Sequence, residues 1–358
     1  MITCVYSSEA PAGWDTVLNA AGCETNFLQS TFWAHLICTL DEAIPHYFRV
    51  IEDSNVLAQA LFLQRWPYDR VNRCKLANDS FLECYDGPVI IRNEQTEEIV
   101  RHILEAASSL AKSTSATSTT IVFSHTSNLS NSLTLKHQFS KYKYTAKQWG
   151  TLLVDIAPPI DTIFMNISHA ARKCIKKCWR LGITIDRIES YNDFHTTFMP
   201  NYNAIEKSCG RAPAHCTLAS PDDWSNYYRF FLARSGSAVL GGLGMFFFNG
   251  VATEVQSTMS LEAFEQKVPV QDLLHWELIL EAKRLGCHTL DLAGFNPNPT
   301  DEKEAGIARF KTKWGGKTIV YSIFSRSPFN ATTFFRNAAS RALSAIGLKS
   351  FLLYFIRR

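Results

Sequence analysis

The sequence has no long hydrophobic run, no secretory pattern and little net charge. No apolar stretch approaches the roughly 18 residues that a membrane-spanning helix needs, and the stretch "MITCVYSSEAPAG" lacks a basic segment followed by an apolar one. We therefore expect a cytoplasmic protein. The formal charge of +3 is too small to attract nucleic acid through the net field, so any polyanion contact must come from local clusters.

A regular cysteine framework is also absent, although the chain has 10 cysteines. Without a secretory signal, reduced and mostly buried thiols are expected. The nearest approach to metal-ligand spacing is His169, Cys174 and Cys178, followed by Cys209 and Cys216. Structural zinc sites use tighter pairs of cysteines, so we expect no metal and no other cofactor.

Length and composition indicate a folded chain of two domains. The 358 residues suffice for two hydrophobic cores, and 46% hydrophobic with 19% charged residues is typical of globular proteins. In the first half, "FLQSTFWAHL" has helical spacing, and "HYFRVIEDSNVLAQALFLQRW" predicts two strands around a turn. An amphipathic helix (96–112) and further strands follow, until Pro158 and Pro159 interrupt the pattern. We place the first domain at 1–157.

The second half repeats this order. A strand pair surrounds the turn Asn249-Gly250, a helix ends at Gly286, and the strands "HTLDLA" and "KTIVYSIF" follow. The glycines of "VLGGLGMFF" lack the spacing of a phosphate loop, so we interpret them as close-packed strand glycines. Such self-similarity predicts two copies of one α/β unit, with a second domain at 158–328 and a basic tail at 329–358.

Several stretches together resemble the Fem-type (FemABX) transferases. They are "FLQSTFWAHL", "NISHAARKCIKKCWRLGITI", "VPVQDLLHWELILEAKRLGCHTLDLAGF" and "GIARFKTKWGG". Members of that family pass an amino acid from aminoacyl-tRNA to a peptidoglycan precursor. The resemblance implies an α/β (α+β) fold of two tandem domains similar to GCN5-related N-acetyltransferases (GNAT), each a mixed, mostly antiparallel sheet flanked by helices. It also implies an acyltransferase.

The same resemblance suggests site residues. Lys311 matches the functional lysine of the family, beside Phe310, and Arg211 approximates a family position near the phosphates of the precursor. Trp33 matches the Trp of the first family motif, and Trp33 and Phe310 are candidate substrate-binding residues. Trp33 is followed two residues later by His35, where family members often carry a phosphate-binding lysine.

Aminoacyl transfer needs positive charge or hydrogen-bond donors where the carbonyl oxygen becomes an oxyanion. Lys311 could supply that charge, or it could extend along the strand edge with its ammonium in water. Asp291 ends an apolar strand and could orient the amine or Lys311, or it could hydrogen-bond the local backbone. Glu254 and Gln256 are weaker candidates, more typical of half-exposed sheet residues.

The helix "NISHAARKCIKKCWRLG" has one cationic face. At about 100° per residue, five cations fall within an arc of roughly 140°; they are Arg172, Lys173, Lys176, Lys177 and Arg180. Either this is an ordinary solvated helix face, or it binds phosphates of a lipid-linked diphosphate, a nucleotide-linked precursor or tRNA.

Two further features bear on the substrates. The position where acetyl-CoA-dependent relatives carry a pyrophosphate-binding loop reads "EQKVPVQDLL", which argues against an ordinary CoA donor. The tail is rich in aromatic residues, Arg and Lys, which fits either an interfacial helix at the inner face of the membrane or a helix docked on the second domain.

The leading hypothesis is an aminoacyltransferase that uses aminoacyl-tRNA and an amine of a lipid-linked or nucleotide-linked envelope precursor. One alternative is an N-acyltransferase that acts on a surface polysaccharide or lipid-linked sugar. Another is a non-catalytic protein of the same fold that binds tRNA or lipid.

Overall fold

The computed structural model describes residues 1–20, 26–69, 74–75, 79–125, 127, 129, 132–210 and 224–327. The chain forms two compact units. Among the described residues, the first comprises most of 1–149 together with 320–327, and the second comprises most of 150–319. The domain ranges 1–157, 158–328 and 329–358 stay predictions of the sequence.

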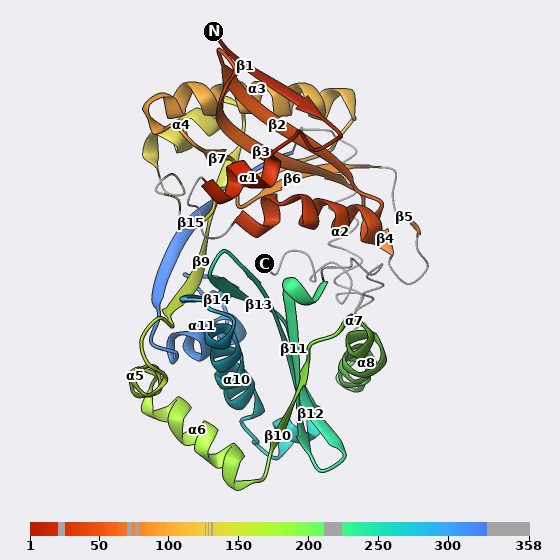
Figure 1. The fold of residues 1–358 in the computed structure, drawn as a ribbon, viewed down its shortest axis with the longest axis vertical. Coiled ribbons are helices and arrows are strands. Elements are labelled where there is room, and N and C mark those ends of the chain that lie inside the picture. Colours follow the sequence, from red (N-terminus) through yellow and green to blue (C-terminus); the bar gives the residue numbers. More distant parts are fainter. Residues whose placement is uncertain are drawn as a thin grey trace. The chain divides into compact units, whose positions relative to one another are not determined.

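The first unit is a sheet with the strand order β1-β2-β3-β6-β8-β15, in which β7 also pairs with β3 (Figure 1). Neighbouring strands are antiparallel except β6 and β8, which are parallel. The elements are β1 (Ile2–Ser7), α1 (Trp14–Ala20), η1 (Asn26–Gln29), α2 (Thr31–Asp41), β2 (Ile44–Glu52), β3 (Asn55–Arg65), β4 (Tyr68–Asp69), β5 (Cys74–Lys75), β6 (Phe81–Tyr85), β7 (Val89–Ile90), η2 (Asn93–Gln95), α3 (Thr96–Ser113), β8 (Thr119–Val122), α4 (Leu133–Lys141) and β9 (Thr145–Asp155).

The second unit is a sheet with the order β9-β14-β13-β12-β11-β10. Here the parallel pair is β13 with β14, and the other neighbours are antiparallel. In chain order, the elements that follow β9 are α5 (Ile160–Asn166), α6 (His169–Arg180), β10 (Thr184–Ile188), α7 (Tyr191–Asp193), η4 (Phe194–Phe198), α8 (Met199–Ser208), η5 (Trp224–Asn226), β11 (Tyr228–Ser235), β12 (Ala238–Phe248), β13 (Val251–Met259), α9 (Leu261–Glu265), α10 (Val270–Arg284), β14 (Thr289–Phe295), α11 (Glu302–Thr312) and β15 (Lys317–Arg326), which belongs to the sheet of the first unit.

The two strand orders are the same once the strands are matched in sequence. In each unit three antiparallel strands lead to one parallel pair, and one helix, α3 or α10, connects the two parallel strands. Each unit is a mixed, mostly antiparallel sheet with flanking helices, which confirms the predicted architecture. The glycines of β12 are close-packed as predicted, since a Cβ on Gly241 would lie 2.9 Å from the Thr258 carbonyl oxygen.

The hydrophobic core of each unit lies between its sheet and its connecting helix. Helix α3 buries an apolar face that includes Ile99, Ile103 and Leu110. Helix α10 packs on β12 and α6, and most of its residues are buried. Because α10 has neighbours on several sides, it also buries polar side chains that a surface helix leaves in water.

Strands β13 and β14 part beyond their third pair. Their parallel ladder joins Val251 to Thr289 and ends at Thr253 with Asp291, although β13 continues to Met259 and β14 to Phe295. Beyond that point β14 is irregular, and Ala293 has a φ of 59°. Both strands are irregular here, because β13 carries a bulge where it pairs with β12. The parted ladder leaves carbonyl groups of β14 available to other donors.

Candidate active site

The segment "FKTKWGG" ends α11 and turns against β9 and α5. Asp301 caps the helix by accepting a hydrogen bond from the Glu304 amide at 2.8 Å. A Cβ on Gly316 would lie 2.5 Å from the Leu153 carbonyl oxygen. Gly315 has a φ of 75°, and a Cβ there would lie 2.7 Å from the Asn166 carbonyl oxygen. The glycine pair therefore lets the turn approach two backbone segments closely.

Lys311 is buried inside the second unit. Its side chain is part of a residue only 8% exposed, and the ammonium donates to the carbonyl oxygens of Leu292, Ala293 (3.1 Å) and Gly294 (3.2 Å). These are the carbonyls that β14 frees where it parts from β13. An ammonium has three N–H donors, so the parted strand engages all of them. The Lys311 ammonium is thus not in water, and it places a positive charge at the parted strands.

Asp291 stands at the last pair of the parallel ladder and is 5% exposed. Its carboxylate accepts hydrogen bonds from the Thr151 hydroxyl and from the Ala293 amide, the latter at 2.8 Å. The bond to Ala293 is the local backbone bond that the sequence offers as one interpretation. It fixes the unusual conformation of β14 beside Lys311. The catalytic role of Asp291 stays a prediction.

His275 of α10 lies between two acceptors and two aromatic rings. Its Nδ1 is 2.7 Å from the Gln271 carbonyl oxygen, and its Nε2 is 3.5 Å from a carboxylate oxygen of Glu254. The imidazole stacks on Trp314 with 5.4 Å between ring centroids, and its edge meets Phe310 at 4.9 Å. The imidazole therefore lies between the backbone of α10, the Glu254 carboxylate and the two aromatic rings.

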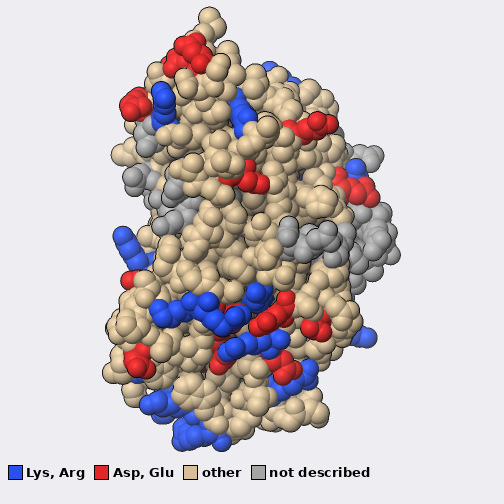
Figure 2. Space-filling view, viewed as in Figure 1, with Lys and Arg blue, Asp and Glu red and all other residues tan. Residues whose placement is uncertain are grey.

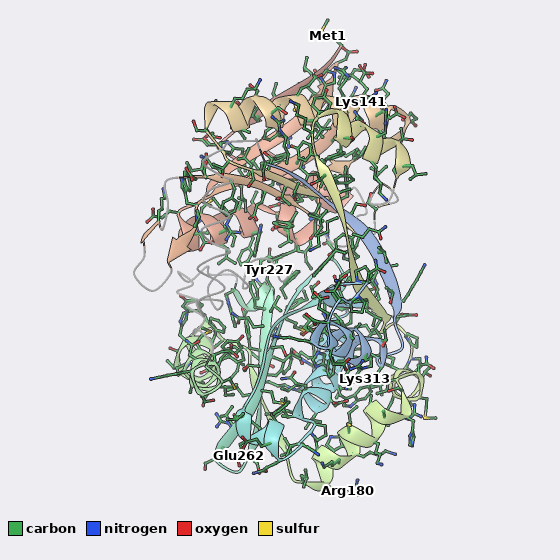
Figure 3. The ribbon with its side chains drawn as sticks, turned by 180° about the vertical axis from the view of Figure 1, so that it is seen from behind. Met1, Lys141, Arg180, Tyr227, Glu262 and Lys313 are labelled. Atoms are coloured by element: carbon green, nitrogen blue, oxygen red, sulfur yellow. The ribbon has the colours of Figure 1, made fainter. Side chains whose placement is uncertain are left out.

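Asp272 forms an ion pair with Lys313, one turn before His275. The Lys313 nitrogen is 2.6 Å from the Asp272 carboxylate and 3.8 Å from the Phe310 ring centroid. Burial raises the pKa of the Asp272 carboxyl, and the Lys313 ammonium offsets only part of that rise. Figure 3 labels Lys313, which lies just after α11. Phe310 thus packs between His275 and Lys313.

Sequence reasoning did not select His275, Asp272 or Lys313. Glu254 was a weak candidate, expected to be half-exposed, and its side chain is 12% exposed. A signal was present in "VQDLLHW", where Asp272 and His275 are three residues apart and so share one side of a helix. The apolar residues around them extend over the whole helix, which predicts a buried helix with buried polar groups.

The cationic helix predicted from the sequence is α6, but its cations differ in what they do. The Arg172 guanidinium donates to the carbonyl oxygens of Met165 (2.6 Å) and Ile167, so it caps the end of α5. Lys173 and Lys176 are exposed. They line a surface hollow together with His169, Arg172, Trp179 and Arg180. Figure 2 shows Lys and Arg side chains gathered over α6.

The other predicted residues lie elsewhere. Trp33 belongs to α2 of the first unit, where it is half-buried with its ring centroid 5.8 Å from that of Phe27. Arg211 and the tail at 329–358 lie outside the described residues. Among the described residues, no three His, Cys, Asp or Glu side chains gather as metal ligands. In the same part of the chain, no helix combines the length and the apolar character that crossing a membrane requires.

Comparisons with known proteins identify the fold. No protein-family model and no curated protein sequence matches the chain. Solved structures do. A crystal structure of FemX aligns with 90% of this chain and 97% of its own, with a TM-score of 0.68 and 14% sequence identity. A tandem GNAT protein from the clavulanic acid biosynthesis pathway aligns with 92% of this chain and 100% of its own, with a TM-score of 0.56 and 9% identity.

A third structure is the C-terminal domain of a proposed lysylphosphatidylglycerol synthetase from Agrobacterium fabrum. It aligns with 87% of this chain and 92% of its own, with a TM-score of 0.53 and 14% identity. At such identities the likeness is one of fold. The chain has the tandem GNAT fold that FemX also has, and the fold class predicted from the sequence is confirmed.

Proposed function

We propose that this tandem GNAT chain is an aminoacyltransferase that moves an amino acid from aminoacyl-tRNA to an amine of a peptidoglycan or other cell-envelope precursor. The observation that carries the proposal is the parting of β13 and β14 beside Lys311. There, the buried Lys311 ammonium and the Asp291 carboxylate both contact the backbone of β14 at Ala293. Such preorganised charge in a dry place is what acyl transfer requires.

In the proposed reaction the amine of the acceptor attacks the ester carbonyl of the charged tRNA. Lys311 stabilises the oxyanion by exchanging one of its carbonyl partners for the more negative oxygen. Asp291 orients the attacking amine. The proton lost by the amine goes to the leaving ribose oxygen or to water.

Substrate contacts in this proposal come from the residues that the Fem-type resemblance and the cationic helix suggest. Phe310 and Trp33 contact the donor or the precursor, and Arg211 and the exposed cations of α6, Lys173 and Lys176, contact phosphates. Arg172 supports that surface by capping α5. The reaction takes place in the cytoplasm, with the basic tail at 329–358 at the inner face of the membrane.

Two neighbours support the choice of substrates. FemX is the structural match with a TM-score of 0.68, and the resemblance to Fem-type transferases covers the segment that holds Lys311. The lysylphosphatidylglycerol synthetase domain is a second structural neighbour, and its name refers to an aminoacylated lipid. Both support transfer of an amino acid rather than of a simple acetyl group.

The test is to incubate the full chain with a mixture of charged tRNAs and envelope precursors, and separately with acyl-CoA. We expect deacylation of charged tRNA that depends on the precursor, and no consumption of acyl-CoA. Consumption of acyl-CoA alone would point to an N-acyltransferase instead. A chain that binds charged tRNA or lipid but turns over neither donor would be a non-catalytic binding protein.

A variant pair then tests the site itself. Lys311→Ala should lower turnover about 100-fold or more, the usual effect of removing one oxyanion donor. Lys303→Ala is the matched control, because Lys303 is exposed on the same helix, and its turnover should equal that of the parent. Equal turnover of both variants would exclude Lys311 as the oxyanion group.

A further inference from the structure

The α5–α6 segment exposes large apolar side chains. Met165 is 66% exposed, Trp179 48% and Leu181 49%. Trp179 is held in place, because its ring stacks on Phe164 with 6.2 Å between centroids. Single exposed apolar residues are ordinary, but three of them at one helical hairpin form a feature that needs a partner.

Cations lie beside Trp179. Lys173, Lys176 and Arg180 are exposed on α6, and the helix contains no acidic residue. The Lys176 nitrogen lies 6.0 Å from the Phe164 ring centroid, so the ammonium stands next to the stacked pair of rings. Lys177 is not part of this surface, since its nitrogen donates to the Lys267 carbonyl oxygen at 2.9 Å. Figure 3 labels Arg180 at the end of α6 that carries Trp179.

Hollows lie on both sides of Trp179. One is the cationic hollow that Lys173 and Lys176 line. The other is lined by Ile183, Ile185, Arg187, Leu273 and Glu277. Trp179 is common to both, so an aromatic side chain stands between a cationic hollow and a hollow with apolar members.

This combination fits a lipid surface better than a nucleic acid. A polyphosphate backbone pairs with the cations, but it gives no gain for burying Met165 and Leu181. At the interface of a bilayer both kinds of side chain gain: Lys and Arg meet anionic headgroups while Trp, Leu and Met enter the boundary between headgroups and acyl chains. The absence of acids from α6 makes the charge complementary to an anionic leaflet.

We propose that the α5–α6 surface, formed by Met165, Lys173, Lys176, Trp179, Arg180 and Leu181, docks the second unit on a membrane rich in anionic lipid. This goes beyond the transferase proposal and does not depend on it, because membrane binding is measured without either substrate. It also differs from the predicted interfacial tail, since every residue of the surface lies on the described hairpin.

The test is sedimentation of the full chain with vesicles at about 0.1 M salt. We expect binding to vesicles of phosphatidylcholine with about one third phosphatidylglycerol, and little binding to phosphatidylcholine alone. At about a fivefold loss for each cation removed near such a surface, Lys173→Gln/Lys176→Gln/Arg180→Gln should bind on the order of 100-fold more weakly. The control Lys141→Gln/Lys143→Gln/Lys147→Gln removes three exposed cations of the first unit and should bind as the parent does.

A second measurement addresses Trp179. Brominated acyl chains quench tryptophans that enter the bilayer, and the quenching seen with the parent should disappear in Trp179→Phe. If the triple variant binds vesicles as strongly as the parent does, the proposal is overturned and the tail is left as the anchor. Absence of vesicle binding by the parent would overturn the proposal equally. So would a triple variant that, when RNA binding is also measured, loses binding to RNA but keeps its binding to vesicles.

Discussion

The two units share a strand order but differ in what their connecting helices bury. Helix α3 of the first unit buries only apolar residues, such as Ile103 and Leu104. Helix α10 of the second unit buries Asp272, His275 and Glu281 among its apolar residues. The difference extends to the sheets, because the parallel ladder of β6 with β8 covers all of β8, whereas the ladder of β13 with β14 ends at Asp291.

The comparison shows which of the two similar units buries polar and charged groups. Burying polar groups costs free energy unless they are paired, and α3 of the first unit avoids that cost because all its buried residues are apolar. The second unit pairs its buried groups with one another, Asp272 with Lys313 and His275 with Glu254, and its parted strands expose carbonyls that Lys311 engages. The charged, parted strand pair is therefore a property of the second unit.

The largest difference in turnover between changes in the two units is expected when one buried histidine is replaced in each. His275→Gln should lower turnover about 100-fold, because it removes the imidazole that contacts Glu254 and stacks on Trp314 of the "FKTKWGG" segment. His46→Gln changes a buried histidine of the first unit whose Nε2 lies 3.4 Å from the Gln64 side-chain oxygen. We expect its turnover, measured per folded molecule, to equal that of the parent.

The two histidines are comparable because both are buried and each has a polar side-chain partner. Circular dichroism of both variants controls for unfolding. Equal losses of turnover in the two variants would mean that the chemistry is not confined to the second unit.

A second comparison concerns two glycines of the second unit. Gly316→Ala should lower the free energy of unfolding by about 1–3 kcal/mol, since the new Cβ would lie 2.5 Å from the Leu153 carbonyl oxygen. Gly306→Ala in α11 should raise it by about 0.5–1 kcal/mol, because the new Cβ meets nothing closer than 3.9 Å and alanine favours helix. Urea unfolding of both variants measures these changes, and a Gly316→Ala variant as stable as the parent would contradict the close packing of the turn.

The contribution of Asp272 of α10 to stability should depend on pH, whereas α3 buries no carboxyl group. Burial raises the pKa of Asp272, so the folded state holds that proton more tightly than the unfolded state. The contribution to stability is present below the ordinary carboxyl pKa of about 3.9 and is lost as the pH rises through the folded-state pKa. The free energy of unfolding of the parent minus that of Asp272→Asn should thus be larger at low pH than at neutral pH. Urea unfolding of both proteins across this pH range is the measurement, and a difference that grows with pH would contradict the raised pKa.

The smallest effect is expected on the outer face of α3. Arg101 pairs with Glu98 at 3.3 Å and Glu105 at 3.2 Å, all three well exposed to solvent. Exposed pairs of this kind contribute little, because water and salt screen them. Arg101→Ala should leave the midpoint of urea unfolding within the error of the measurement. A clear loss of stability would show that α3 depends on its surface charges more than on its apolar face.

Much of the fold could be read from local pattern. The turn at Asn249-Gly250, the end of a helix at Gly286 and the order of strands and helices all follow from residues close together in the sequence. The site could be read only in part. "FKTKWGG" drew attention to Lys311, but nothing local indicates that its ammonium contacts the carbonyls of Leu292 to Gly294, 17 to 19 residues away.

By itself, the sequence determined the repeated α/β units, the cationic face of α6 and the close-packed glycines, because periodicity and turn chemistry act over a few residues. Only the tertiary structure decided which polar residues share a surrounding. Glu254 lies beside His275 because a strand and a helix that are separated in the sequence pack there. The residue at which a strand ladder ends, and the charged side chain that lies beside that end, depend on the packing of the whole unit.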